Sequence, residues 1–262
     1  MLKQKRYRNL FVISLIGLML ISCTRGSPSD SEAEEIIHDF WEGDYEYTVY
    51  SKHGEGSERF HEEVKGKLIS DPYQQYEQAV DASETQGIVE QYWYMQGENV
   101  VYNMKMSVSN RPDYWTTFES GAKGSDMYIK EDLAFTFDRE ETVSGRKVCV
   151  YRTQFEEEHV ADYSQLPEED GKVPEKFTLP FTMVMEYYID FTEKEVVRIR
   201  LDGTDSARAA EIANLMYSGM TQEEAEEEFR ENGSEETYEV IYDIKNFNGA
   251  VEIDPPEDLK EL

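Results

Sequence analysis

The chain has 262 residues, which is enough for one large domain or two small ones. Hydrophobic residues make up 39% of it, and 18 Tyr, 12 Phe and 3 Trp supply enough apolar surface for a packed core, which excludes wholesale disorder. The 56 acidic residues outnumber the 26 Lys and Arg, so the formal net charge is −30. Because such a charge repels phosphate backbones, we expect no nucleic-acid partner.

Residues 1–22 predict a signal peptide. Four basic residues between Lys3 and Arg8 precede an apolar run from Leu10 to Ile21. The run is about 12 residues long, and at about 1.5 Å per residue it is too short to cross a hydrocarbon core of roughly 30 Å. A basic head before a short apolar run is typical of a secretory leader.

The end of this leader, Leu20-Ile21-Ser22-Cys23, resembles the lipobox of bacterial lipoproteins. In that family the cysteine thiol takes a diacylglyceryl group, and a dedicated peptidase then cuts on its amino side. The resemblance implies an extracytoplasmic protein that acyl chains such as palmitate on Cys23 anchor to the cell membrane, and two chains suffice for stable anchoring. The alternative is an ordinary buried cysteine beside an ordinary signal sequence.

The other cysteine, Cys149, cannot form an internal disulfide if Cys23 carries lipid. It lies in the alternating segment Lys147–Tyr151, which predicts a buried structural thiol rather than a nucleophile. Residues 23–33 are expected to form the lipidated cysteine and a polar tether, because Thr24 to Asp30 are mostly small and polar. The folded domain is then expected over residues 34–262.

Helical spacing is expected at three places. Ser31 and Glu34 match a capping box that opens a short amphipathic helix, which Gly43 ends. Residues 205–233 predict a late helical insert of two helices, separated at Gly219, and the second opens with a capping box of Thr221 and Glu224. The segment 71–83 is ambiguous between helix and strand.

Most of the remaining chain alternates between apolar and polar residues, which predicts strands. After an alternating start at Tyr45, we expect a hairpin of residues 88–95 and 100–108, with its turn at 96–99. Further strands are expected over residues 113–118, 127–137, 146–155, 181–190, 196–201 and 237–246. Regular short strands with turns between them predict a mainly β (α+β) fold, built on one large antiparallel sheet in a meander.

The order of these elements resembles the LolA/LppX-like lipoprotein-carrier family, and most closely a branch of such lipoproteins in Gram-positive bacteria. The resemblance covers roughly residues 34–258. It rests on Val64-Lys65-Gly66-Lys67 before Asp71-Pro72, Gly145-Arg146-Lys147-Val148, Tyr187-Tyr188-Ile189-Asp190, Glu193-Lys194, Val196-Val197-Arg198-Ile199, and the ending Tyr242 to Pro255. It implies a single curved antiparallel sheet forming an incomplete barrel, whose concave apolar face is covered by helices and can hold an acyl chain. No binding residue of the family maps onto this chain individually.

Motifs for catalysis or metal binding are weak. None of the four histidines, His38, His53, His61 and His159, lies at a metal-binding spacing. Two Ser-x-x-Lys matches, at Ser120 and Ser144, contain glycine and fit inter-strand turns better than the helix start that this chemistry requires. We therefore expect no enzyme, no catalytic residue, no metal and no cofactor.

Two apolar stripes are the candidate ligand-binding residues. We place them on the concave side of the sheet, where methionine adapts to irregular apolar guests. They consist of Tyr102, Met104, Met106, Phe181, Met183, Met185 and Tyr187. The expected partner is a lipid or another hydrophobic small molecule. Two alternatives stay open: the stripes are ordinary core, or the protein is a surface interaction or envelope-sensing module that uses its acidic outer face.

Overall fold

The fold is described from a computed structural model of the chain. The residues that it describes are 29–54, 60–80, 87–108, 111–120, 133–162, 176–233 and 237–259. The predicted signal peptide and most of the predicted tether lie outside these residues, as does the greater part of the strand expected over 127–137.

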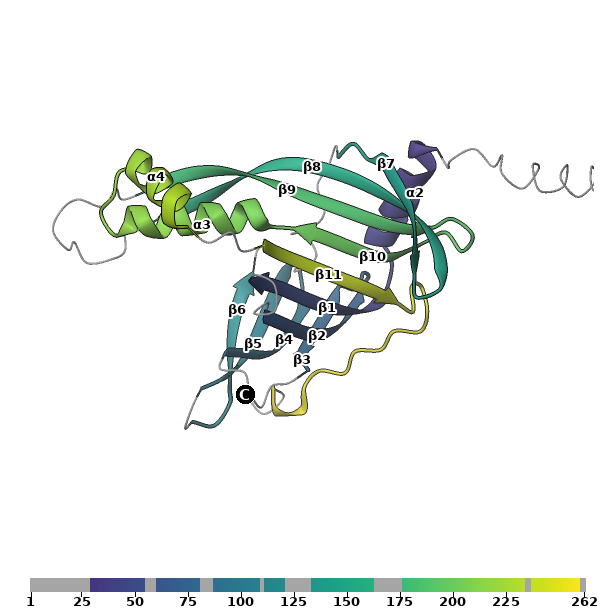
Figure 1. The fold of residues 1–262 in the computed structure, drawn as a ribbon. Coiled ribbons are helices and arrows are strands. Elements are labelled where there is room, and N and C mark those ends of the chain that lie inside the picture. Colours follow the sequence, from purple (N-terminus) through teal and green to yellow (C-terminus); the bar gives the residue numbers. More distant parts are fainter. Residues whose placement is uncertain are drawn as a thin grey trace, which may run out of the picture.

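A single antiparallel sheet of eleven strands dominates the structure (Figure 1). The strands are β1 (Tyr45–Gly54), β2 (Phe60–Ile69), β3 (Gln74–Ala79), β4 (Gly87–Gln96), β5 (Asn99–Ser107), β6 (Tyr114–Ser120), β7 (Thr136–Val143), β8 (Arg146–Asp162), β9 (Lys176–Asp190), β10 (Glu195–Asp202) and β11 (Thr237–Lys245). Their order across the sheet is β6-β5-β4-β3-β2-β1-β11-β10-β9-β8-β7. Consecutive strands are neighbours in the sheet except β6 and β7, which lie at its opposite edges. The first and last strands, β1 and β11, pair in the middle of the sheet and so join the two halves of the chain.

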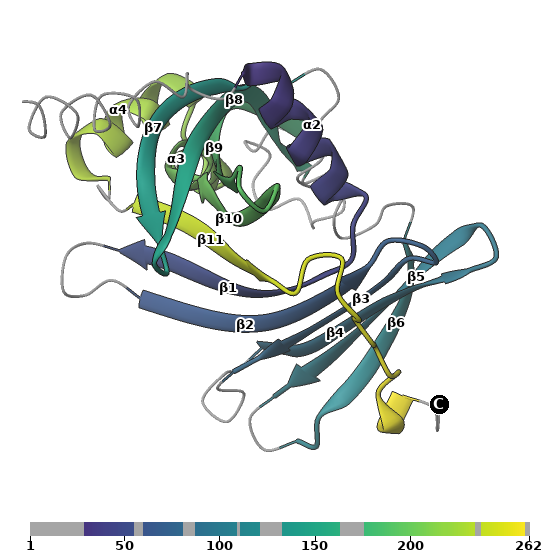
Figure 2. The ribbon, with the colours of Figure 1, turned by 90° about the vertical axis from the view of Figure 1, so that its right-hand side faces the viewer.

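The sheet is strongly curved, and β6 and β7 are its two edges, so the described strands form an incomplete barrel (Figure 2). This confirms the predicted fold class. The hairpin of β4 and β5 is also confirmed, with Gln96 paired to Asn99 and Gly97 in the left-handed region at φ 67°. A two-residue turn of this kind favours residues that tolerate positive φ, which explains the glycine.

The strand expected over 127–137 is displaced, since 133–135 lie outside any strand and β7 extends six residues beyond 137. Two further strands were not expected from the sequence. Residues 71–83, where helix and strand were both considered, contain β3, and β2 precedes it. The alternation in both is broken by polar residues: the concave side of β3 carries Gln75 and Glu77 rather than apolar side chains. Pairing on both sides within the sheet therefore decides their conformation, not hydrophobic periodicity.

The first helix, α2 (Asp30–Trp41), starts earlier than predicted. Its N-cap is Ser29, whose side chain accepts a hydrogen bond from the Glu32 amide at 3.2 Å, so the prediction of a cap at Ser31 was wrong. The sequence offers the same spacing twice, Ser29 with Glu32 and Ser31 with Glu34. The earlier start also places Asp30 and Glu32 in the first turn, where the helix dipole favours negative charge.

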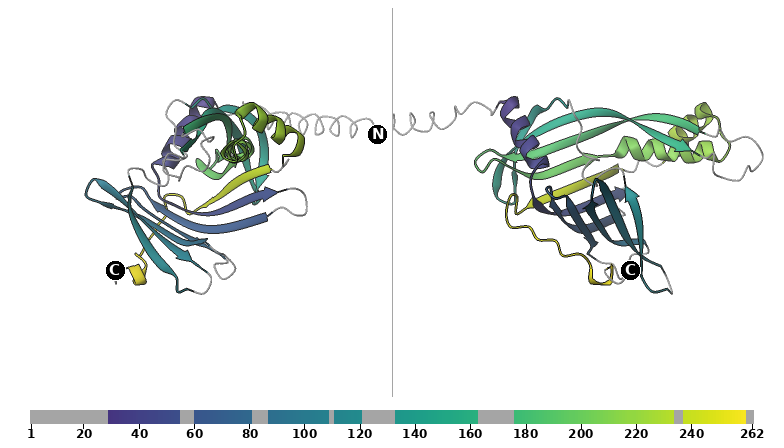
Figure 3. Two further views of the ribbon diagram at one scale, coloured as in Figure 1. Left: turned by 90° about the vertical axis from the view of Figure 1, so that its left-hand side faces the viewer. Right: turned by 180° about the vertical axis from the view of Figure 1, so that it is seen from behind.

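The late helical insert is confirmed as α3 (Thr204–Tyr217) and α4 (Gln222–Asn232). Thr221 and Glu224 form the predicted capping box, with hydrogen bonds of 3.3 and 2.9 Å. Figures 2 and 3 show α2 and α3 inside the curve formed by β7 to β11. The insert makes a separate small core with the far end of β9, in which Leu179 and Ala225 are buried.

After β11, the chain crosses the convex side of the sheet and ends in a short 3-10 helix, η3 (Glu257–Leu259). Lys67 donates a hydrogen bond to the Glu252 carbonyl at 3.1 Å, and Lys105 contacts Asp258 at 2.7 Å. The neighbours of each lysine in its strand face the concave side, and successive side chains of a strand point to opposite faces. Both lysines, and the C-terminal segment that they contact, therefore lie on the convex side.

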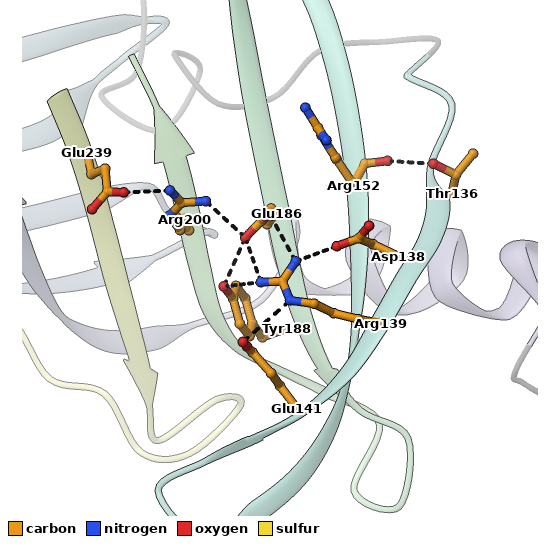
Figure 4. A network of polar contacts seen from close by, with 9 residues as sticks. All are labelled: Thr136, Asp138, Arg139, Glu141, Arg152, Glu186, Tyr188, Arg200 and Glu239. Carbon is orange, nitrogen blue, oxygen red and sulfur yellow. Dashed lines mark hydrogen bonds and ion pairs between the residues drawn. The ribbon is translucent and has the colours of Figure 1, made fainter. Parts of the chain in front are cut away.

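The convex face is held by polar contacts across β7 to β11 (Figure 4). Arg139 donates two hydrogen bonds of 3.1 Å to the Glu186 carboxylate, and Arg200 bridges Glu186 at 3.3 Å and Glu239 at 2.5 Å. Tyr188 donates to Glu186 at 2.9 Å. Burial raises the pKa of Glu186, but the hydrogen bonds from Arg139 and Tyr188 and the charges of Arg139 and Arg200 outweigh it, so that the pKa lies below its ordinary value.

The Glu186→Gln variant should unfold with a free energy about 2 kcal/mol lower than the wild type at neutral pH, because two guanidinium groups lose their buried counter-charge. A lowered folded-state pKa stabilises the fold fully above the unfolded pKa, about 4.3, and this stabilisation is lost as the pH falls through the folded value. The difference between wild type and variant in urea unfolding should therefore shrink as the pH is lowered from about 7 to about 3.

The control is Glu156→Gln, an exposed position on β8. This change should alter the free energy of unfolding by no more than about 0.5 kcal/mol at any of these pH values. A difference between wild type and Glu186→Gln that stays constant down to acidic pH would contradict the assignment of a stabilising charge to Glu186.

Candidate ligand cavity on the concave face

A cavity of about 300 Å³ opens on the concave face, where β1 to β4 meet β10 and β11. Its volume lies at the lower end of the range of small-molecule sites, roughly 300–1,000 Å³. The apolar lining consists of Phe40, Trp41, Tyr45, Tyr47, Val49, Val64, Leu68, Trp93, Ile199, Tyr238, Val240, Tyr242 and Ile244. The polar lining consists of Ser51, Gln75, Glu77 and Gln91. A mostly apolar cavity with a few grouped polar side chains is the usual form of a small-molecule binding site.

The C-terminal turn of α2 forms one wall of this cavity. Phe40 is fully buried and stacks on Tyr45, with ring centroids 4.6 Å apart. Trp41 meets Tyr187 edge to face at 6.1 Å. These two adjacent aromatic residues at the end of α2 therefore pack the helix on the sheet and also line the cavity.

Cross-strand register sets the floor of the cavity. Ile244, Tyr47, Gly66, Glu77 and Gln91 are successive partners across β11, β1, β2, β3 and β4. The ring of Tyr47 lies over Gly66, since a Cβ atom at Gly66 would be 2.1 Å from that ring. Because Gly66 has no side chain, the Tyr47 ring can extend across β2. Its hydroxyl then donates a hydrogen bond to Glu77 on β3 at 2.7 Å.

A polar cluster of Tyr47, Gln75, Glu77 and Gln91 results. Gln75 donates hydrogen bonds to the Tyr47 hydroxyl at 2.8 Å and to Glu77 at 3.1 Å, and Gln91 donates to Glu77 at 3.1 Å. Burial raises the pKa of Glu77 above its ordinary value, against the smaller effect of the hydrogen bonds from Tyr47 and Gln75. Part of its surface is accessible because it lines the cavity.

The first predicted stripe continues the same face beyond the cavity. Tyr102 is the cross-strand partner of Trp93, stacks on it at 4.8 Å, and donates a hydrogen bond to Gln91 at 2.6 Å. Met104 is the partner of Gln91, and Met106 is the partner of Ile88. None of the three lines the cavity itself, and all are partly exposed.

The second predicted stripe lies on the other half of the concave face, in β9. Met185 and Tyr187 are fully buried in the main core, and Met183 packs against that core. Phe181 packs against the separate core under α3 and α4. The structure thus brings Tyr102, Met183, Met185 and Tyr187 around one core but leaves Phe181 in another.

Several lining residues were not selected from the sequence as ligand contacts. The alternation of Tyr45, Tyr47 and Val49 marked a strand, but it carried no sign that this strand faces a cavity. Glu77 and Gln91 carried no signal at all, because their proximity depends on the pairing of β3 with β4.

Three further observations concern membrane spanning, metal binding and the reactivity of Cys149. Within the described ranges, no helix is both long and apolar enough to span a bilayer. Nor does any cluster of three or more His, Cys, Asp or Glu side chains suited to a metal ion occur among these residues. Cys149 is half-buried, and burial raises the pKa of its thiol, which makes a reactive thiolate less available.

Comparison with known proteins gives matches only at the level of structure. No protein-family model and no curated protein sequence matches the chain. Among solved structures, it is similar to the Mycobacterium tuberculosis lipoprotein LppX, with a TM-score of 0.42 and 11% identity over 86% of this chain and 97% of that one. It is also similar to LprF from Mycobacterium bovis (TM-score 0.38, 13% identity, 88% and 99% coverage) and to a LolA superfamily protein from Nitrosomonas europaea (0.31, 10%, 87% and 96%).

The Gly66→Ala variant should lower the free energy of unfolding by about 1–3 kcal/mol, because the added methyl group overlaps the Tyr47 ring and must displace it. Urea denaturation measures this cost directly. In a Tyr47→Val background, where the overlapping ring is absent, the same glycine substitution should cost less than about 1 kcal/mol. Equal costs in the two backgrounds would show that the ring does not depend on the space above Gly66.

Proposed function

We propose that this protein is an extracytoplasmic lipoprotein, anchored through lipid on Cys23, that binds a lipid or another hydrophobic small molecule without catalysing a reaction. The observation that carries the proposal is the cavity of about 300 Å³, lined mainly by aromatic and aliphatic side chains on the concave face of an incomplete barrel. Apolar cavities admit apolar guests, since no buried polar group then loses a hydrogen-bond partner.

The ligand is further proposed to extend from the cavity along β5. Tyr102 connects the two regions through its contacts with Trp93 and Gln91. Beyond it, Phe118 and Tyr114 on β6 are 43% and 45% exposed, which is unusual for large apolar side chains on the inner face of a curved sheet. In this arrangement Met104 and Met106 would contact the distal part of the acyl chain, while Met185 and Tyr187 support the wall from within the core.

The Val64→Phe variant tests occupancy of the cavity. Val64 lines the cavity and is only partly buried, so a larger side chain there should fill the space that a ligand needs. Binding of a fluorescent acyl-chain probe with an uncharged polar end should weaken by about tenfold or more, the loss expected when about 1.4 kcal/mol of apolar contact is removed. Titration of probe fluorescence measures the dissociation constant.

The matched control is Val160→Phe, the same change at a residue that is 49% exposed on β8 and does not line the cavity. It should leave the dissociation constant unchanged. Met104→Trp addresses the proposed extension over β5 and should also weaken binding. If the wild type binds no amphiphile and Val64→Phe is merely destabilised, the carrier function is wrong, and the acidic outer surface becomes the better candidate for function.

The anchor is tested by Cys23→Ala. If the thiol of Cys23 carries the lipid, cells fed radiolabelled palmitate should incorporate label into the wild type but not into this variant, whose precursor should also resist the lipoprotein peptidase. Cys149→Ala is the control and should remain labelled, because that thiol lies half-buried within β8. Label retained by Cys23→Ala would rule out the proposed anchor.

A further inference from the structure

The polar cluster around Glu77 is the feature of the cavity that an apolar guest alone does not explain. Glu77 accepts hydrogen bonds from Tyr47 at 2.7 Å, Gln75 at 3.1 Å and Gln91 at 3.1 Å. An ionised carboxylate offers about four acceptor positions, so the described residues supply donors for three of them. The carboxylate lines the cavity, which leaves a ligand access to it.

The surrounding side chains are oriented so that this carboxylate meets donors only. Tyr73 donates to the amide oxygen of Gln75, and Tyr102 donates to the amide oxygen of Gln91, both at 2.6 Å. With their oxygens engaged, both glutamines must present their NH₂ groups to Glu77. Glu77 therefore acts only as a hydrogen-bond acceptor in this network, whose other side chains belong mainly to β1, β3, β4 and β5.

Among the described residues, the lining of the cavity offers no counter-ion to an ionised Glu77. None of the described residues that line it is a Lys, Arg or His. A carboxylate in mostly apolar surroundings is costly unless it is paired or fully hydrogen-bonded. The carboxylates of the convex face differ in this respect, since Glu186 is bound by Arg139 and Arg200. A ligand that brings a hydrogen-bond donor or a positive charge to Glu77 would supply what the protein does not.

We propose that the ligand is a single-chain amphiphile whose polar end donates hydrogen bonds to Glu77, through hydroxyl or ammonium groups, while its tail occupies the apolar part of the cavity. This inference rests on the proposed binding function and narrows it to a ligand class. An amphiphile that ends in a carboxylate is disfavoured, because it would place a second negative charge beside Glu77 without a donor. The proposed contact site for the polar end is formed by Glu77, Gln91 and Tyr47, which the strand register brings together. The two apolar stripes predicted from the sequence do not form it.

The experiment compares three brominated probes with the same C18 tail: 9,10-dibromostearic acid, its glycerol monoester and the corresponding amine. Bromine quenches nearby tryptophans, and Trp41 and Trp93, two of the three tryptophans, line the cavity. The full chain is used with Cys23→Ser in every sample, so that no acyl chain of its own competes. The wild-type cavity should bind the amine and the monoester at least about tenfold more tightly than the acid, the effect of one hydrogen bond to a charged group.

Glu77→Gln should reduce the preference for the amine over the acid by about tenfold, since it keeps the shape but removes the charge. Glu90→Gln is the matched control: Glu90 precedes Gln91 on β4, faces the convex side and pairs with Lys105, so this change should leave the preference intact. The control also separates binding at Glu77 from general attraction of an ammonium group to the acidic chain. The monoester arm distinguishes hydroxyl donors from charged ones.

Two results would overturn the inference and leave the binding function standing: a wild-type preference for the acid, or a preference for the amine that Glu77→Gln does not change. Absence of quenching by all three probes would instead overturn the binding function itself. Because the ranking of the three probes is measured on the wild-type cavity, a preference for the acid would overturn the inference even if the Glu77→Gln variant did not fold.

Discussion

Strand register in one antiparallel sheet is the constraint on which the rest of this structure depends. Alternate residues of each strand face the same side, so eleven strands in register create one continuous concave face and one continuous convex face. A shift of one residue in β1 or β3 would move Tyr47 or Glu77 from the cavity to the outside. The cavity, the polar cluster and the core are therefore products of the same pairing.

The concave face is covered unevenly. The C-terminal turn of α2 brings Phe40 and Trp41 against β1 and β9, and the α3–α4 insert packs on the distant part of β9 around Leu179. The cavity lies beside the end of α2 and is bounded by strands from both halves of the chain, β1 to β4 on one side and β10 and β11 on the other. The helices leave an apolar cavity on the concave face uncovered, and this cavity is the basis of the proposed binding function.

The carboxylates of the convex and concave faces have different hydrogen-bond donors. On the convex side, carboxylates of β9 and β11 are paired with arginines of β7 and β10, as Figure 4 shows for Glu186 and Glu239. On the concave side, Glu77 accepts hydrogen bonds from amide and hydroxyl donors, and none of the described lining residues is a cation. Carboxylates that are paired with arginines stabilise the sheet and are not available to a ligand. A carboxylate that is hydrogen-bonded but not paired with a cation can still accept a hydrogen bond from a ligand.

The sequence by itself determined the elements whose signal is local. Alternation over residues 100–108 and 181–190 predicted strands, Gly97 predicted a hairpin turn, and Thr221 with Glu224 predicted the start of a helix, because each depends on residues that are neighbours in the chain. The start of α2 was misplaced by two residues, since the same cap spacing occurs twice. Only the tertiary structure decided that β11 pairs with β1, that Gly66 makes room for Tyr47, and that Glu77 meets Gln91 beside an apolar cavity. These are contacts between strands, and the alternation of a single strand shows which residues share a face but not which strand will lie beside it.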